Sequence, residues 1–209
     1  MFVAGKYEAS PVARPEGDVQ IATDQYGNVK TVGAGTAGSP SGGVQTVQGY
    51  AYSSTVSFNR TADTNPYAAN DAVGSSTGAG GAVLSFTNAG PSGGGEVTIT
   101  SASLEIDVNA VPSGMTTFRL YFYSGTPNSN LGDNGAWDLT SGDRATFLKY
   151  IDLGAPVDLG STLYVQADGL GTQITVPSGG ALTAYLVTAG AYTPASGTTY
   201  KINLKAAGF

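Results

Sequence analysis

The stretch "TTFRLYFYS", residues 116–124, decides the fold class of this chain. Apolar side chains alternate here with two tyrosines and an arginine, and a period of two places alternate side chains on opposite faces of a β-strand. The apolar set is Phe118, Leu120 and Phe122, and the other set is Arg119, Tyr121 and Tyr123. The stretch therefore predicts a strand with one face in an apolar core.

Segments of similar character lie on both sides of this strand, separated by turns rich in Gly, Pro, Asn and Ser. They are residues 51–58, 82–89, 96–108, 147–153, 161–167, 172–177, 181–189 and 198–206. The apolar phase shifts between Ile99 and Leu104, which predicts a β-bulge near Ser101–Ser103. No long amphipathic helical pattern intervenes, and short strands joined by turns are typical of sandwiches. We predict an all-β domain over residues 46–209, an antiparallel β-sandwich of jelly-roll-like type.

The sequence of residues 1–45 predicts an N-terminal segment that is separate from the β-sandwich domain. An extended arm containing Pro11 and Pro15 precedes a small hairpin in "DVQIATDQYGNVKTV", residues 18–32, and a Gly/Ser linker follows. The linker contains a literal G-x-G-x-x-G, but "SPSGG" follows it and cannot open the helix that a nucleotide site requires. Since an isolated hairpin is marginally stable in water, we expect it to dock elsewhere. Its interface candidates are Val19, Ile21 and Tyr26.

Composition excludes several classes of function. The net charge is −6, and the nine Lys and Arg residues are scattered singly, so no basic cluster exists to neutralise nucleic-acid phosphates. No apolar run is long enough for a membrane span, and the first residues do not resemble a secretory signal. The chain has no Cys and no His, which removes thiolate chemistry, His general bases and His-ligated metals. We therefore expect no enzymatic activity, no cofactor, no nucleic-acid partner and no membrane association.

Carboxylates gather in "LGDNGAWDLTSGDR", residues 131–144, around the chain's single tryptophan, Trp137. Asp133, Asp138 and Asp143 form a weak candidate for a structural cation, because their spacing is irregular and no Glu closes the set. The alternative is that Thr140 or Ser141 caps a short turn that has Asp143 at its start. On this interpretation Trp137 plugs the end of the sandwich, and Asp133→Asn hardly changes stability.

The second face of the strand at 116–124 is an interface candidate. Arg119, Tyr121 and Tyr123 project together, so this face is either exposed or covered by a neighbouring subunit. A carbohydrate-binding platform built from Trp137 and these tyrosines is the alternative. Elsewhere Glu105 and Asp107 share a strand face, but they precede the turn "NAVPSG", where charged residues normally meet solvent. They do not predict a glycosidase.

Two segments resemble structural proteins of tailed-bacteriophage virions. They are "RPEGDVQIATDQYGNVKTV", residues 14–32, and "FRLYFYSGTPNSNLGDNGAWDLTSGDRATFLKYIDLG", residues 118–154. The resemblance implies a head decoration (cement) protein, usually a jelly roll or related sandwich that oligomerises on the shell. The implied partners are the major capsid protein and other copies of this chain, most simply in a homotrimer. The implied location is the capsid surface of the virion, after assembly in the host cytoplasm. The alternatives are a tail, neck or fibre component of the virion, or a carbohydrate-binding or adhesion module.

Overall fold

A computed structural model describes residues 49–208 of this chain. These residues form ten strands in two antiparallel sheets, and no helix occurs among them. The all-β prediction is therefore confirmed for this part of the chain. The arm, the hairpin that carries Val19, Ile21 and Tyr26, and the Gly/Ser linker lie outside the described residues and stay predictions.

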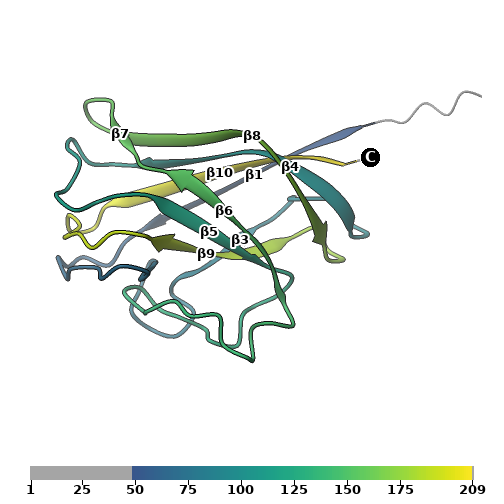
Figure 1. Ribbon diagram of the computed structural model, residues 1–209, viewed down its shortest axis with the longest axis horizontal. Coiled ribbons are helices and arrows are strands. Elements are labelled where there is room, and N and C mark those ends of the chain that lie inside the picture. The colour runs from purple at the N-terminus through teal and green to yellow at the C-terminus, as the bar shows by residue number, and fades with distance from the viewer. Residues whose placement is uncertain (1–48, 209) are drawn as a thin grey trace, which may run out of the picture. The chain divides into compact units, whose positions relative to one another are not determined.

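The first sheet has the strand order β1-β10-β4-β8-β7. Its strands are β1 (Tyr50–Asn59), β10 (Thr199–Gly208), β4 (Gly95–Ile106), β8 (Leu163–Val176) and β7 (Val157–Asp158). β1 and β10 pair along their full length without a register shift, from Tyr50 opposite Gly208 to Asn59 opposite Thr199. This sheet forms the upper layer in Figure 1.

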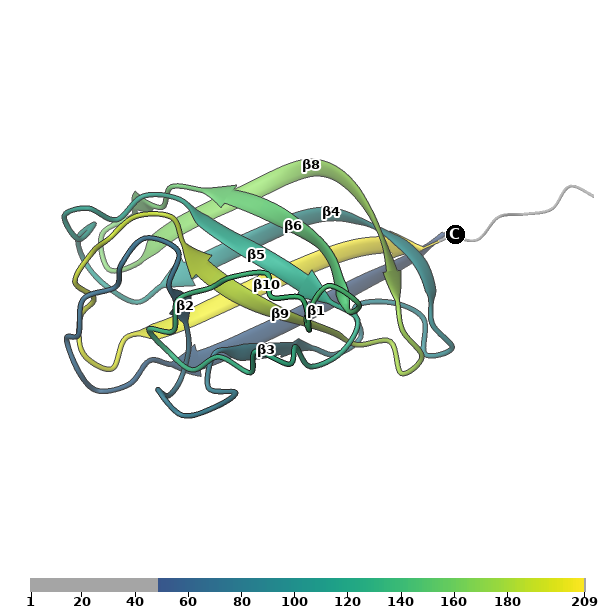
Figure 2. The same ribbon diagram turned by 60° about the horizontal axis from the view of Figure 1, so that its bottom comes forward.

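The second sheet has the strand order β2-β9-β5-β6, and β3 also pairs with β9. Its strands are β2 (Ala72–Val73), β9 (Leu182–Thr188), β5 (Phe118–Tyr123), β6 (Phe147–Gly154) and β3 (Val83–Phe86). β2 and β3 pair with successive parts of β9, on the side away from β5. In Figure 2 this sheet lies in front of the first.

One apolar core is shared by the two sheets. Phe118, Leu120 and Phe122 of β5 are completely buried in it, together with Ile99 and Leu104 of β4. These are the alternate residues whose apolar character predicted the strand, so the inward face of β5 is confirmed. Burial of a large apolar side chain stabilises a fold by about 1.5–3 kcal/mol relative to exposure, and this core supplies most of the driving force.

The predicted bulge is present on β4, and it is matched by a larger irregularity on β8. The register between the two strands shifts between Ile99 and Ser101, which leaves Thr100 unpaired. Opposite Thr100, the segment 169–171 loops out of the ladder, and Gly169 and Gly171 adopt positive φ angles of 63° and 56°. We expected a turn between two strands here, but the glycines form a kink within a single strand.

Candidate functional site

The loop of residues 124–146, here called the cover loop, joins β5 to β6 and lies over the outer face of the second sheet (Figure 2). Backbone hydrogen bonds attach it to the segment around β2. The amide of Trp137 donates to the Asn70 carbonyl at 2.8 Å, and the amide of Asp133 donates to the Ser76 carbonyl at 2.7 Å. The loop is thus fixed to strand-flanking backbone at several points, although it contains no regular strand of its own.

Trp137 holds the middle of the cover loop against the sheet. Its ring stacks on Tyr121 with centroids 3.7 Å apart and an interplanar angle of 26°. Its Nε1 donates a hydrogen bond to the Tyr123 hydroxyl at 3.1 Å. Leu131 and Leu139 pack beside it in the same apolar cluster. Trp137 therefore covers a sheet face, and the expectation that it plugs the end of the sandwich is wrong.

Tyr121 and Tyr123 are enclosed within this chain. Tyr121 is 7 % exposed and Tyr123 is fully buried, both beneath the cover loop. The sequence offered two possibilities for this face, exposure or burial by a neighbouring subunit, and the structure shows a third, burial by the chain's own loop. The two tyrosines are therefore unavailable as an interface or a sugar platform. Burial raises the pKa of Tyr123 to about 12, although its hydrogen bond from Trp137 acts in the opposite direction.

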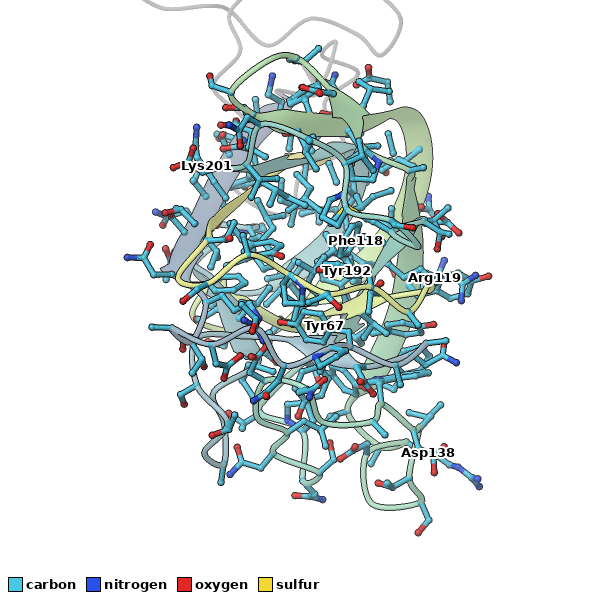
Figure 3. All side chains as sticks on the ribbon, turned by 90° about the vertical axis from the view of Figure 1, so that its left-hand side faces the viewer. Tyr67, Phe118, Arg119, Asp138, Tyr192 and Lys201 are labelled. Carbon is cyan, nitrogen blue, oxygen red and sulfur yellow. The ribbon has the colours of Figure 1, made fainter. Side chains whose placement is uncertain are left out.

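Arg119 is the member of that set which stays at the surface. Its Nε lies 3.3 Å from a carboxylate oxygen of Asp152 on the neighbouring strand β6, and both side chains are partly exposed. In Figure 3 Arg119 projects from the periphery of the molecule, whereas Phe118, one residue earlier, points into the interior. Arg119 remains an interface candidate on geometric grounds.

Asp133 lies in a buried ionic cluster and is not a surface residue of the loop. One carboxylate oxygen accepts hydrogen bonds from the Tyr67 hydroxyl, at 2.5 Å, and from the Gly74 amide, at 2.9 Å. The other oxygen lies 3.4 Å from Nε of Arg60, and both side chains are fully buried. Removing the charge of Asp133 would leave Arg60 buried beside a neutral partner. The expectation that Asp133→Asn is nearly neutral is therefore replaced by that of a large loss of stability.

Arg60 connects this cluster to the segment that follows β1. Its Nη2 lies 2.8 Å from a carboxylate oxygen of Asp63, and its Nη1 donates to the Asp63 carbonyl at 2.7 Å. Its Nε donates to the Tyr67 hydroxyl at 2.7 Å. Burial raises the pKa of Tyr67 above its usual range, and the hydrogen bond to Asp133 adds to this effect. Tyr67 therefore stays protonated and donates to Asp133.

Two further aromatic rings extend the cluster into the core. The rings of Tyr67 and Tyr192 lie 5.2 Å apart, and the hydroxyls of Tyr192 and Tyr200 are 3.1 Å apart. Figure 3 shows Tyr67 and Tyr192 together in the interior, next to Phe118. Because Arg60 and Asp133 are 73 positions apart in the chain (133 minus 60), no local spacing could have indicated this pair.

Asp143 orders the end of the cover loop. One of its carboxylate oxygens accepts a hydrogen bond from the Ser129 amide at 3.0 Å, and its backbone carbonyl accepts from the amides of Thr146 and Phe147. Burial alone would raise the pKa of Asp143, but hydrogen bonds from Ser129 and Thr140 to the carboxylate lower it overall. The predicted short turn with Asp143 near its start is present, and the Asp143 carboxylate attaches it to the first part of the same loop.

The three aspartates of the candidate cation site do not come together. Asp133 faces Arg60, Asp143 faces the Ser129 amide, and Asp138 is exposed, at the periphery in Figure 3. Within residues 49–208 no cluster of three or more acidic side chains could hold a metal ion. Their spacing in sequence was misleading because the loop directs each carboxylate to a different partner. Buried as they are, Asp133 and Asp143 act on the fold and not on a ligand.

The sequence matches no model of a known protein family, and no curated protein sequence shows significant similarity to it. Residues 49–208 contain no helix that is long and apolar enough to cross a membrane.

Proposed function

We propose that this chain is a non-enzymatic structural protein of a tailed-bacteriophage virion, a head decoration (cement) protein that binds the shell of major capsid protein and stabilises it. It acts at the capsid surface as a homotrimer, after assembly in the host cytoplasm. The proposal starts from the resemblance of residues 14–32 and 118–154 to virion proteins. Three properties of the described residues support it.

The first property is the strand order, which supports a jelly-roll β-sandwich. Without the two-residue strands β2 and β7, eight strands remain. Numbered along the chain from one to eight, they follow the orders 1-8-3-6 and 2-7-4-5 in the two sheets. This arrangement corresponds to the two Greek keys of a jelly roll, an architecture of many capsid proteins.

The second property, strand β1, carries the proposal. Within residues 49–208 its backbone is paired on one side only, by β10. Its sequence, "YAYSSTVSFN", has no charged residue, no Pro and no Gly, and Tyr50 at its start is 59 % exposed. Soluble proteins normally protect an edge strand with charges, Pro or bulges, because a bare edge accepts another strand. A strand of ten residues that carries none of these protective features, and that has one free side among residues 49–208, is therefore suited to assembly by strand addition.

The third property is that the buried charged side chains hold loops in place within the fold. Arg60, Asp133 and Asp143 are engaged in fastening the cover loop and the segment after β1. Such interior networks suit a rigid building block better than a catalyst, which has to present its reactive groups to a substrate.

We propose that the predicted hairpin of residues 18–32 in one copy extends the β1 edge of a neighbouring copy on the shell.

The test is to mix undecorated shells with the purified full-length chain. The protein should co-sediment with the shells and raise the temperature at which they open. The double variant Tyr50→Lys/Ala51→Lys, which places charges on the β1 edge, should lose trimer formation and shell binding. Leu159→Lys is the matched control, because Leu159 is 66 % exposed in the turn after β7, away from β1. Shells that neither retain the wild-type chain nor gain heat stability would contradict the proposal.

A tail, neck or fibre component of the same virion is the alternative, since such proteins are also β-rich and oligomeric. The number of copies per particle separates the two. Quantitative mass spectrometry of purified virions should find hundreds of copies for a shell protein and only a handful for a tail protein. Electron microscopy of the particle would then locate the corresponding density.

A further inference from the structure

The outward face of the first sheet is an ordered array of polar side chains. On the middle strand β4 these are Glu105, Ser103 and Ser101, and the side chains opposite them on β10 are Lys201, Asn203 and Lys205. The hydroxyls of β1 lie beyond β10, so that Thr55, for example, lies opposite Asn203. Lys201, labelled in Figure 3, projects outward from this face on the side of the molecule away from Arg119.

β8 forms the other side of the array. Tyr164, Gln166 and Asp168 lie opposite Glu105, Ser103 and Ser101 respectively. Because serines occupy the middle strand while longer side chains stand on β8 and β10, the face is hollowed along β4. The hollow has a volume of about 260 Å³, and the side chains of Tyr164, Gln166 and Asn203 line it. A second hollow, lined by Glu105 and Lys201, continues it toward Asp107.

The polar groups of this face are held in place by one another across the strands. The side-chain amide of Asn203 donates to the Ser103 hydroxyl and to Glu105, each at 3.2 Å, and accepts from the Thr55 hydroxyl at 2.9 Å. The ammonium group of Lys201 contacts both carboxylate oxygens of Glu105, at 3.1 and 3.2 Å. Side chains ordered in advance lower the entropic cost of binding a ligand.

The polar side chains of β8 are also connected to one another, along the strand. The amide of Gln166 donates to both carboxylate oxygens of Asp168, at 2.7 Å, and its carbonyl oxygen accepts from the Tyr164 hydroxyl. The Tyr164 ring is partly exposed at the wall of the hollow. The hollow therefore brings amides, hydroxyls, a carboxylate and one aromatic ring close together.

We propose that this hollow is a binding site for a neutral oligosaccharide. Its charges balance, because the charged side chains that line it are one acidic residue, Glu105, and one basic residue, Lys205, so a polyanion such as nucleic acid is disfavoured. Hardly any apolar side chain lines it, so a lipid or an apolar peptide has nothing to bury. Sugar hydroxyls both donate and accept hydrogen bonds and so suit this mixture of amide, hydroxyl and carboxylate groups. The Tyr164 ring offers a surface for the apolar side of a pyranose.

The proposal is independent of a role in the virion, because the site lies within one copy of the chain and needs no partner. It also differs in position from the sugar platform that the sequence indicated. Trp137, Tyr121 and Tyr123 belong to the second sheet and its cover loop, whereas the hollow belongs to β4, β8 and β10 of the first sheet.

The experiment uses the purified full-length chain and an array of immobilised neutral oligosaccharides that includes maltohexaose, cellohexaose and chitohexaose. Sugars bound on the array are then measured by titration calorimetry. Tyr164→Ala and Gln166→Ala should each weaken binding about tenfold or more, because each removes hydrogen-bonding or stacking groups of the site. The melting temperature of each variant checks its fold, and Gln166→Ala, at an exposed position, tests the site even if Tyr164→Ala does not fold.

Tyr150→Ala is the matched control, since Tyr150 is an exposed strand tyrosine of the second sheet, at 57 % exposure. It should leave the affinity unchanged. Absence of binding to every sugar on the array at millimolar concentration would overturn the proposal. Unchanged affinity in both hollow variants, or equal loss of affinity in Tyr150→Ala, would overturn it as well.

Discussion

The indole of Trp137 lies nearly flat on the ring of Tyr121, at 3.7 Å between centroids, while its Nε1–H reaches the hydroxyl of Tyr123 at 3.1 Å. One side chain of the cover loop thus stacks on one tyrosine of β5 and donates a hydrogen bond to the next tyrosine on the same face. Tyr121 in turn stacks on Tyr150 of β6 at 5.6 Å. These contacts help to bury the outer face of the second sheet in a second apolar cluster beneath the cover loop.

We expect Trp137→Ala to lower the free energy of unfolding by about 2 kcal/mol, somewhat less than for a wholly buried tryptophan because the side chain is partly exposed. Trp137→Phe keeps the stacking and should cost about 1 kcal/mol through the lost hydrogen bond. Urea denaturation followed by circular dichroism measures both. Equal costs for the two variants would show that stacking on Tyr121 contributes nothing.

We expect Asp133→Asn to lower the free energy of unfolding by about 3 kcal/mol, because it removes the negative charge beside the fully buried Arg60. Asp63→Asn should cost less, since Asp63 is the partly exposed partner of the same guanidinium. Asp138→Asn, in the same loop but exposed, is the control and should be nearly neutral. Chemical denaturation at neutral pH provides the comparison, and equal effects at Asp133 and Asp138 would contradict the ionic cluster.

Asp143 should make stability depend on acidic pH. Burial opposes ionisation, but hydrogen bonds from Ser129 and Thr140 favour the ionised form, so its pKa in the folded chain lies below the value of 3.8 for an unperturbed aspartate. The stabilisation is therefore complete above pH 3.8 and is lost as the pH falls through the lower folded value. The deficit of Asp143→Asn relative to the wild type should be largest at neutral pH and should shrink under acid conditions. A deficit independent of pH would exclude this role of the carboxylate.

The buried tyrosines should govern behaviour in alkali. Burial raises the pKa of Tyr123 and of Tyr200 to about 12, and it also raises the pKa of Tyr67 and of Tyr192 well above the usual range. Since these folded values exceed the unfolded value of 10.0, their contribution to stability is complete below pH 10 and is lost as the pH rises through the folded values. Ultraviolet titration should show the exposed tyrosines ionising first and the buried set ionising only as the chain unfolds. Ionisation of all tyrosines together near pH 10, with the fold intact, would contradict this burial.

The strand pattern of this domain was predictable because it depends on neighbouring residues. Alternation at Phe118, Leu120 and Phe122 identified both the strand and its inward face, and the phase shift after Ile99 located the bulge to within a few residues. The kink at Gly169 and Gly171 was misread as a turn, because glycines that permit positive φ have the same local signature in either structure.

Whether the outer face of each sheet is covered or exposed could not be predicted, because this depends on contacts between segments that are distant in the sequence. Alternation in residues 116–124 says that Tyr121 and Tyr123 share a face, but it does not say that a loop beginning at residue 124 folds back over them. Likewise the pairing of Asp133 with Arg60 depends on the path of two loops. The hollow above Ser103 arises from the register of β4 with β8 and β10, which no single strand contains.

The cover loop has an evolutionary consequence, because it gives the two sheets different freedom to vary. Substitutions at Tyr121, Tyr123 or Tyr185 disturb a closed apolar cluster, so this side of the molecule is constrained by folding alone. Side chains such as Gln166 and Lys205 point to solvent and contribute little to the core, so they can be exchanged at small energetic cost. Selection can therefore alter what the open sheet recognises while the covered sheet keeps the scaffold constant.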